Sequence, residues 1–306
     1  MKTRLILLAL APLWMLPSHS GFAQEPLKYG SAVKLSPVFY LPVLAAEARG
    51  FFKENGVAAE WFPARSGADL QREFAASAIP IASSTGTADV LAIARGVPTV
   101  IVANLQSNDD FAIWIGADSR IRAPQDLKGA KLGVSQLGGA EHAYGRLTAD
   151  RLGLANEVRF VSTGGIQESL ALLATGGIDG VVLTPSQMIN LKLKGKVRNL
   201  LPVELPKPWE AFTVTARRDF VAKQPDQVRR VVRALIAANR FIMSPDGKPW
   251  ALATMKSESK YSDVAAEAIY KTLDLSQDGR IDPAAIRNVT QFLVKYDLLK
   301  PDQAPS

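Results

Sequence analysis

The sequence contains no cysteine among its 306 residues. This absence excludes disulfides, thiolate metal sites and cysteine nucleophiles together. Histidine is nearly as scarce, since the chain holds only His19 and His142. His19 lies in a segment that we expect to be removed, so one histidine would remain and a histidine-based metal cluster is excluded. We therefore expect neither a bound metal nor a cofactor.

Long apolar runs are also missing, apart from a short one near the N-terminus. Lys2 and Arg4 precede the apolar residues 5–16, and small residues follow at Gly21 and Ala23. The run is shorter than the roughly 20 residues that a membrane-spanning helix needs. The order of charge, apolar run and small residues is typical of a secretory signal peptide. We predict cleavage after residues 1–23 and export to the periplasm, without a lipoprotein anchor because no cysteine follows the run.

Clustered basic charge is the third feature that the chain lacks. Its net charge of +7 falls to +5 once Lys2 and Arg4 are removed, and most other basic residues are scattered. The densest group is Arg229, Arg230 and Arg233, opposite the apolar stripe of a predicted helix. This pattern is typical of a solvated helix face. Export, together with the lack of aromatic residues among the basic ones, argues against nucleic acid as a partner.

Strand and helix patterns alternate along most of the chain with short connections, as in parallel sheets covered by helices on both faces. Residues 126–154 show the unit most clearly, with a strand at 131–134, a glycine turn at 135–140 and a helix at 141–152. We predict strands at residues 27–33, 57–62, 79–82, 99–104, 111–117, 131–134, 158–161, 180–183, 198–201 and 212–216. We predict helices at residues 38–49, 67–76, 88–95, 141–152, 166–174, 185–194, 226–243, 249–257, 263–273 and 283–296.

Two extended segments, near residues 104–111 and 205–212, separate these units into two halves. The pattern therefore predicts an α/β protein of two lobes, capped by C-terminal helices. A cleft between two lobes is a preferred place for a ligand.

Three strings resemble a known family. Residues 35–57 (LSPVFYLPVLAAEARGFFKENGV) resemble the opening helix and turn of solute-binding proteins of the nitrate/sulfonate/taurine, or NMT1/THI5-like, type. Residues 123–135 (APQDLKGAKLGVS) resemble the start of their second lobe, and residues 169–185 (SLALLATGGIDGVVLTP) a later segment. The likeness runs over nearly all of the mature chain.

The resemblance implies a type II periplasmic binding protein fold, with two doubly wound α/β lobes joined by a two-segment hinge. Lobe 1 would comprise residues 24–106 and 210–306, and lobe 2 residues 107–209. It also implies a function: the substrate-binding component of an ABC importer. Such a component captures a small polar or anionic organic solute, sulfonate-, nitrate- or pyrimidine-like, and delivers it to a permease in the inner membrane. We expect a monomer.

Candidate binding residues follow from the rule that ligands lie beyond the carboxyl ends of strands, at helix N-termini. Three loops fit. The first carries Ser83, Ser84 and Thr85, which are more hydroxyls than one helix cap needs. The second loop, at residues 135–140, holds two glycines, and the third begins at residue 184. The predicted ligand-binding residues are Ser36, Tyr40, Ser83, Ser84, Thr85, Ser135, Gly138, Gly139, Glu141, His142, Thr184 and Trp209.

Several of these residues have a second interpretation. Glu141 gains from the helix dipole as a simple cap, whereas in the cleft it would repel a sulfonate and accept an amine or a ring N–H. His142 either donates to an anion or is solvated. Tyr40 reaches the cleft or packs in the core, and Trp209 lies where an aromatic ring would stack on a planar ligand. The sequence leaves these alternatives open.

Catalysis is the competing class of function. It requires a nucleophile with a base, paired carboxylates or a metal. Glu141 and His142 are the only charged neighbours near the predicted cleft, and adjacent helical residues point in different directions. We therefore expect no enzyme, and keep a periplasmic enzyme and a ligand-sensing subunit as alternatives. Residues 274–285 resemble a calcium loop, but Ala285 replaces the carboxylate at its twelfth position.

Overall fold

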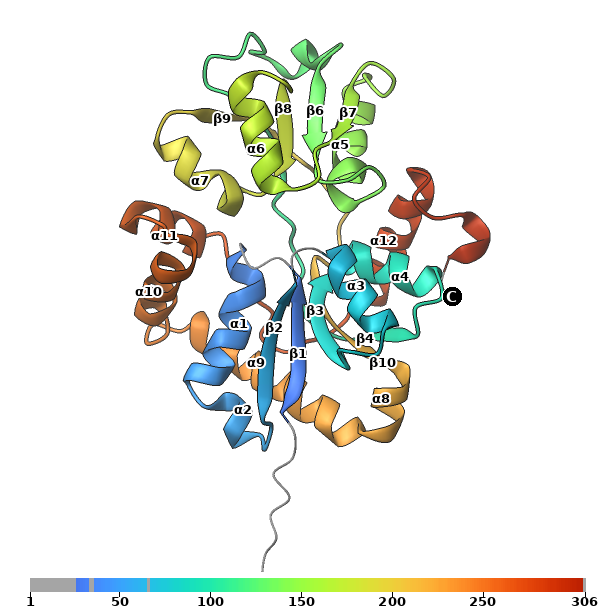
Figure 1. Ribbon diagram of the computed structural model, residues 1–306, viewed down its shortest axis with the longest axis vertical. Helices are drawn as coiled ribbons and strands as arrows, with labels where there is room; N and C mark the ends of the chain where they lie inside the picture. The colour runs from blue at the N-terminus through green and yellow to red at the C-terminus, as the bar shows by residue number, and fades with distance from the viewer. Residues whose placement is uncertain (1–25, 33–35, 65–66, 305–306) are drawn as a thin grey trace, which may run out of the picture.

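The computed structural model describes residues 26–32, 36–64 and 67–304. The predicted signal peptide at residues 1–23 lies outside these ranges. Within them, none of the helices combines the length and the apolar character that crossing a bilayer requires. The described chain forms two five-stranded sheets, with helices on their faces (Figure 1).

The first sheet has the strand order β2-β1-β3-β10-β4. Strand β1 pairs in parallel with β2 and β3, and β10 lies antiparallel between β3 and β4. The strands are β1 (Leu27–Ala32), β2 (Ala59–Ala64), β3 (Ile81–Thr85), β4 (Thr99–Gln106) and β10 (Phe212–Arg217). The connecting helices are α1 (Pro37–Ala48), α2 (Phe51–Glu54), α3 (Gly67–Ala75) and α4 (Gly86–Ala94).

The second sheet has the order β7-β6-β8-β5-β9. Strand β6 is parallel to β7 and β8, and β5 is antiparallel to both β8 and β9. The strands are β5 (Ala112–Gly116), β6 (Lys131–Val134), β7 (Arg159–Ser162), β8 (Gly180–Leu183) and β9 (Val197–Pro202). The helices are η1 (Pro124–Leu127), α5 (Ala140–Arg151), α6 (Ile166–Thr175) and α7 (Pro185–Leu193).

The sheets are therefore mixed, whereas the alternation of strands and helices suggested parallel ones. The two antiparallel strands, β5 and β10, each come directly after a segment that crosses between the sheets. Strands β4 and β9 end at the edge that faces the other sheet, so the crossing chain enters the next sheet at that edge. It must then run away from the edge, opposite to the parallel strands. This path of the chain explains why β5 and β10 are antiparallel to their neighbours.

The C-terminal third is helical, as the pattern predicted. Its elements are α8 (Arg218–Lys223), α9 (Pro225–Ile242), α10 (Lys248–Ser259), α11 (Asp263–Tyr270), α12 (Pro283–Lys295) and η2 (Pro301–Gln303). Asp282 caps α12 through its carboxylate, which accepts the Ala284 N–H at 2.7 Å. Helices α10 and α11 lie on one side of the space between the sheets, and α12 lies on the other (Figure 1).

Two apolar clusters hold the fold together. The larger extends from β1 and α1 through both crossing segments to α12. The smaller surrounds Trp114 of β5, whose indole N–H donates to the Leu183 carbonyl at 2.9 Å. Asp89 of α4 is the principal buried charge of the first sheet, and its carboxylate accepts from the Thr213 hydroxyl at 2.6 Å, the Thr215 hydroxyl and the Gln71 amide. These bonds fix α4 against β10, so the residues at the start of α4 are held in a defined position.

Candidate functional site

The carboxyl ends of the parallel strands in both sheets face the same space. Two crossing segments, residues 107–111 and 203–211, span it (Figure 1). A small cavity of about 10 Å³ lies there, enough for roughly one water molecule. It is lined by Ser36, Pro37, Gln106, Asp110, Ser186, Phe212, Ile269, Thr272 and Leu273. We call this the cleft cavity; Ser186 reaches it from the second half, and the other lining residues belong to the first half and to the first crossing segment.

One predicted residue lines this cavity, and a second shares a hydrogen bond with a residue that lines it. Ser36 lines it and precedes α1, without a hydrogen bond from its side chain to the helix. Thr184 is buried before α7, and its hydroxyl shares a 2.8 Å hydrogen bond with that of Ser186, which lines the cavity. The start of α7 therefore brings hydroxyl groups of the second sheet to the cavity.

The serines of the first predicted loop face the interior. Ser83 lies close to the Tyr29 hydroxyl and Ser84 close to the Asp89 carboxylate. Thr85 caps α4 by accepting the Ala88 N–H at 3.2 Å. None of the three lines the cleft cavity, so their contact with a ligand stays a prediction.

The second predicted loop closes on itself. The Glu141 carboxylate accepts the Ser135 N–H at 2.5 Å and the Ser135 hydroxyl at 3.1 Å. Burial raises the pKa of Glu141. His142 Nδ1 accepts the Gly138 N–H at 3.1 Å, and Gly138 adopts the φ of +80° that this turn requires. Gly139 precedes the first turn of α5. The capping interpretation of Glu141 is thus the one that these bonds favour.

His142 also packs edge-on against the ring of Phe160, with 5.0 Å between centroids. Burial, and then the charge of Arg146, lower the pKa of His142. Its imidazole is therefore neutral at pH 7 and offers an anion little electrostatic attraction.

Replacing Glu141 by glutamine tests this interpretation. Glutamine keeps an oxygen for the Ser135 N–H, so the free energy of unfolding should change by less than about 1 kcal/mol, and ligand affinity should not change. Glu141→Ala leaves that N–H unpaired and should cost about 1–3 kcal/mol. Urea unfolding and titration calorimetry of both variants measure these effects. A tenfold loss of affinity in Glu141→Gln would instead place the carboxylate against the ligand.

Tyr40 and Trp209 belong to packed surroundings. The Tyr40 hydroxyl lies 2.7 Å from the Ser259 hydroxyl and joins α1 to α10, and burial raises the pKa of Tyr40. Trp209 is buried against Phe292 and Tyr144, with centroid distances of 5.3 and 6.3 Å. Neither side chain lines the cleft cavity, and stacking of a ligand on Trp209 stays a prediction.

The first crossing segment carries residues that the sequence interpretation missed. Asp109 accepts the Tyr144 hydroxyl at 2.8 Å, and Asp110 lines the cleft cavity. Burial, followed by the charge of Asp110, raises the pKa of Asp109 to about 8, and burial raises the pKa of Asp110 to about 6. Two adjacent acids directly before the apolar strand at residue 111 were the signal that could have identified them.

Bonds on both flanks hold the two sheets together. On one flank the Tyr261 hydroxyl donates to the Ser186 carbonyl at 2.5 Å. On the other, Asp150 of α5 accepts from the Tyr296 hydroxyl at 3.0 Å and from Lys295 at 2.9 Å. Opening the cleft cavity from either side requires breaking these bonds.

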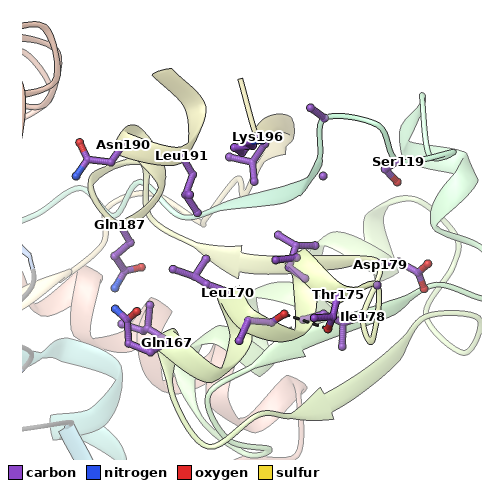
Figure 2. A pocket seen from close by; sticks show the side chains of 18 of the residues that line it. Ser119, Gln167, Leu170, Thr175, Ile178, Asp179, Gln187, Asn190, Leu191 and Lys196 are labelled. Atoms are coloured by element: carbon purple, nitrogen blue, oxygen red, sulfur yellow. Dashed lines mark hydrogen bonds between the residues drawn. The ribbon is translucent and has the colours of Figure 1, made fainter. Parts of the chain in front are cut away.

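A larger groove of about 1170 Å³ lies between α6 and α7 and reaches the edge of the cleft at Ser259 and Tyr261. Figure 2 shows Leu170 of α6 and Leu191 of α7 along it, with Gln167 opposite Gln187. None of the residues predicted to bind a ligand lines this groove. Among the described residues, no group of three histidine, aspartate or glutamate side chains is placed to hold a metal ion.

The family model described as NMT1/THI5 like matches residues 39–247. The riboflavin-binding protein RibY of Chloroflexus aurantiacus is 23% identical over 204 residues, which are 64% of this chain and 56% of that protein. The chain thus spans little more than half the length of this relative.

Two solved structures are similar in fold. A Candida albicans gene product with the generic periplasmic binding protein fold superposes with a TM-score of 0.80 at 16% identity, over 91% of this chain and 93% of that one. The alkanesulfonate-binding protein SsuA from Xanthomonas axonopodis pv. citri, bound to MOPS, gives 0.78 at 17% identity, over 91% and 95%. These matches confirm the predicted fold class.

Proposed function

The chain belongs to the NMT1/THI5-like family, and from that premise we propose that it is the solute-binding component of an ABC importer. It captures a small polar solute between two lobes and delivers it to a permease in the inner membrane. The observation that carries the proposal is the cleft cavity. Ser36, Gln106, Asp110 and Ser186 reach it from both sheets and from a crossing segment. The cavity as it stands has room for roughly one water molecule, so a solute enters when the halves separate and is then contacted from both sides.

The proposal extends to the division of the chain. The lobes are residues 24–106 with 210–306, and residues 107–209, and the crossing segments are the hinge between them. The solute favours the closed state because it contacts both lobes at once, which is a population shift driven by ligand contacts. The bonds of Tyr261 and Asp150 are available only in that state. The mature protein acts in the periplasm as a monomer.

Binding without turnover agrees with the geometry at α5. Glu141 and His142 bond to separate groups of their own loop, the Ser135 and Gly138 N–H groups. They therefore do not form an acid–base pair. RibY is named for riboflavin and SsuA for alkanesulfonates, so relatives and structural neighbours differ in ligand and do not fix the solute of this chain.

Native mass spectrometry of the exported protein tests the proposal. We expect a small molecule to copurify and to dissociate under collisional activation. Removing it by mild denaturation and refolding should increase the radius of gyration in X-ray scattering, and adding it back should reverse the change. Two results together would contradict the proposal. The exported protein would carry no solute, and a periplasmic extract of the producing cells would not change its radius of gyration.

A further inference from the structure

If the cleft cavity binds a solute, as proposed above, the charge of its lining residues favours some solutes over others. Asp110 is the charged residue among those that line it, and no lysine, arginine or histidine of the described chain does so. Asp109 precedes Asp110 in the chain and interacts with its charge, and Tyr261 of the α10–α11 connection also lies near enough to interact with that charge. The cavity therefore presents negative charge without a cation to balance it.

Gln106 provides an independent observation. Its side chain is 4% exposed and lines the same cavity, and its Oε1 atom has no hydrogen-bond partner. Its amide nitrogen is occupied, because it donates to the Asn108 carbonyl at 2.5 Å. A buried acceptor without a donor is unfavourable, because it has lost its hydrogen bonds to water without gaining another. The Gln106 Oε1 atom can therefore accept a hydrogen bond from a ligand.

The second carboxylate has a related arrangement. Asp109 uses one oxygen for the Tyr144 hydroxyl at 2.8 Å, while its Oδ1 atom is buried without a partner. The cleft cavity thus contains two acceptors, the Gln106 oxygen, which has no hydrogen-bond partner, and the Asp110 carboxylate, whereas Asp109 keeps its proton at neutral pH because its pKa is raised to about 8. A sulfonate or nitrate, which only accepts hydrogen bonds, would leave them unpaired.

We infer that the cleft selects a solute with a positively charged nitrogen group, namely a protonated amine, an amidine or a guanidine. Its N–H groups donate to the Gln106 oxygen and to the Asp110 carboxylate, and its charge is balanced by Asp110. Two opposite charges in contact at a site partly shielded from water attract each other more strongly than they do in water, and an anion at the same place is repelled. The inference rests on the proposed function but names a ligand class opposite in charge to sulfonates.

Matched pairs of probes test this inference. Butylamine is compared with butanesulfonate, and benzamidine with benzenesulfonate, by thermal shift and titration calorimetry of the full mature protein. Agmatine adds a guanidine. We expect the cations to raise the melting temperature and the sulfonates to leave it unchanged. The most stabilising cation should bind Asp110→Asn at least tenfold more weakly.

Asp246→Asn is the matched control, because Asp246 is exposed in the turn between α9 and α10 and the substitution removes the same charge. Its affinity for the cation should stay within twofold of the parent. A sulfonate that binds, or an Asp110→Asn variant with unchanged affinity, overturns the inference and leaves the proposed function intact. If none of the cations raises the melting temperature or gives a heat of binding, the inference is also overturned. The proposed function is tested separately, by whether a solute copurifies with the protein.

Discussion

The protein in its closed form is expected to lose about 2 kcal/mol of stability between pH 6.5 and pH 8. The cause is the set of buried carboxyl groups around the two crossing segments. Burial raises the pKa of Asp109 to about 8 and that of Glu210 to about 7. In the unfolded chain both groups ionise near pH 4. The folded protein therefore holds more protons than the unfolded chain throughout this range.

The direction of the effect follows from proton linkage. Each additional proton bound by the folded state lowers its stability by about 1.4 kcal/mol per unit rise in pH. Stability is thus highest toward pH 6.5 and falls as the pH passes the raised pKa values of Glu210 and Asp109. His142 opposes this trend only slightly. Its pKa is lowered in the folded protein, whereas the unfolded imidazole, with an ordinary pKa near 6.5, still binds part of a proton at pH 6.5, so this residue adds less than about 0.5 kcal/mol of stability as the pH rises to 8.

Urea unfolding at pH 6.5 and pH 8 measures the difference. Asp109→Asn should remove most of it, because asparagine carries no ionisable group and keeps an oxygen for the Tyr144 hydroxyl. Asp246→Asn should leave the pH dependence unchanged, since Asp246 is exposed. Stability that rises from pH 6.5 to pH 8, or an Asp109→Asn variant with the full pH dependence, would show that these carboxyls do not control it.

The second large effect is expected from Gly86→Ala. Gly86 begins α4, and its N–H donates to the Ala211 carbonyl of the second crossing segment at 2.9 Å. A Cβ atom at this position would lie 2.1 Å from the Glu210 carbonyl oxygen and 3.1 Å from its carbon. Because these atoms are backbone, they cannot rotate away. The crossing segment must move, at a cost of about 2–3 kcal/mol.

This substitution should also disturb closure. The displaced segment carries Glu210, whose carboxylate accepts the Asp282 N–H at 2.9 Å and so holds the crossing segment against the start of α12. We expect a lower urea midpoint and a larger radius of gyration in the variant. Both quantities can be measured on the same unliganded sample.

Gly116→Ala is the matched control, because a Cβ at Gly116 meets no heavy atom within 4 Å. Its free energy of unfolding should stay within about 0.5 kcal/mol of the parent. Equal losses in the two variants would mean that the close approach of the second crossing segment to Gly86 is not what makes alanine unfavourable.

Local elements were largely predictable. The strand at 131–134 agrees with the structure, because the apolar pattern that predicts a strand acts over a few neighbouring positions. The short helices α2 and α8 were missed, since four and six residues are too few to show a helical period. The resemblance to a family supplied the order of the two lobes.

The site was predictable only in part. Loops after the strands were the right places to search, and Ser36 and the start of α7 do reach the cleft cavity. Ser84 lies beside Asp89 and Ser135 bonds to Glu141, and contact of either serine with a ligand stays a prediction. Which way a hydroxyl points depends on partners far away in the chain, and local pattern does not contain them.

By itself the sequence determined most of the helices and strands and the lack of any thiol chemistry, because these follow from short-range periodicity and from composition, while the fold family was implied by the resemblance of three strings to a known family. Only the tertiary structure decided that β10 enters between β3 and β4 and that Gln106 and Asp110 meet Ser186 around one closed cavity. These contacts join residues about 75 to 130 positions apart. They arise when the two crossing segments fold both halves over the same space, and it is burial there that gives the carboxyl groups their raised pKa values.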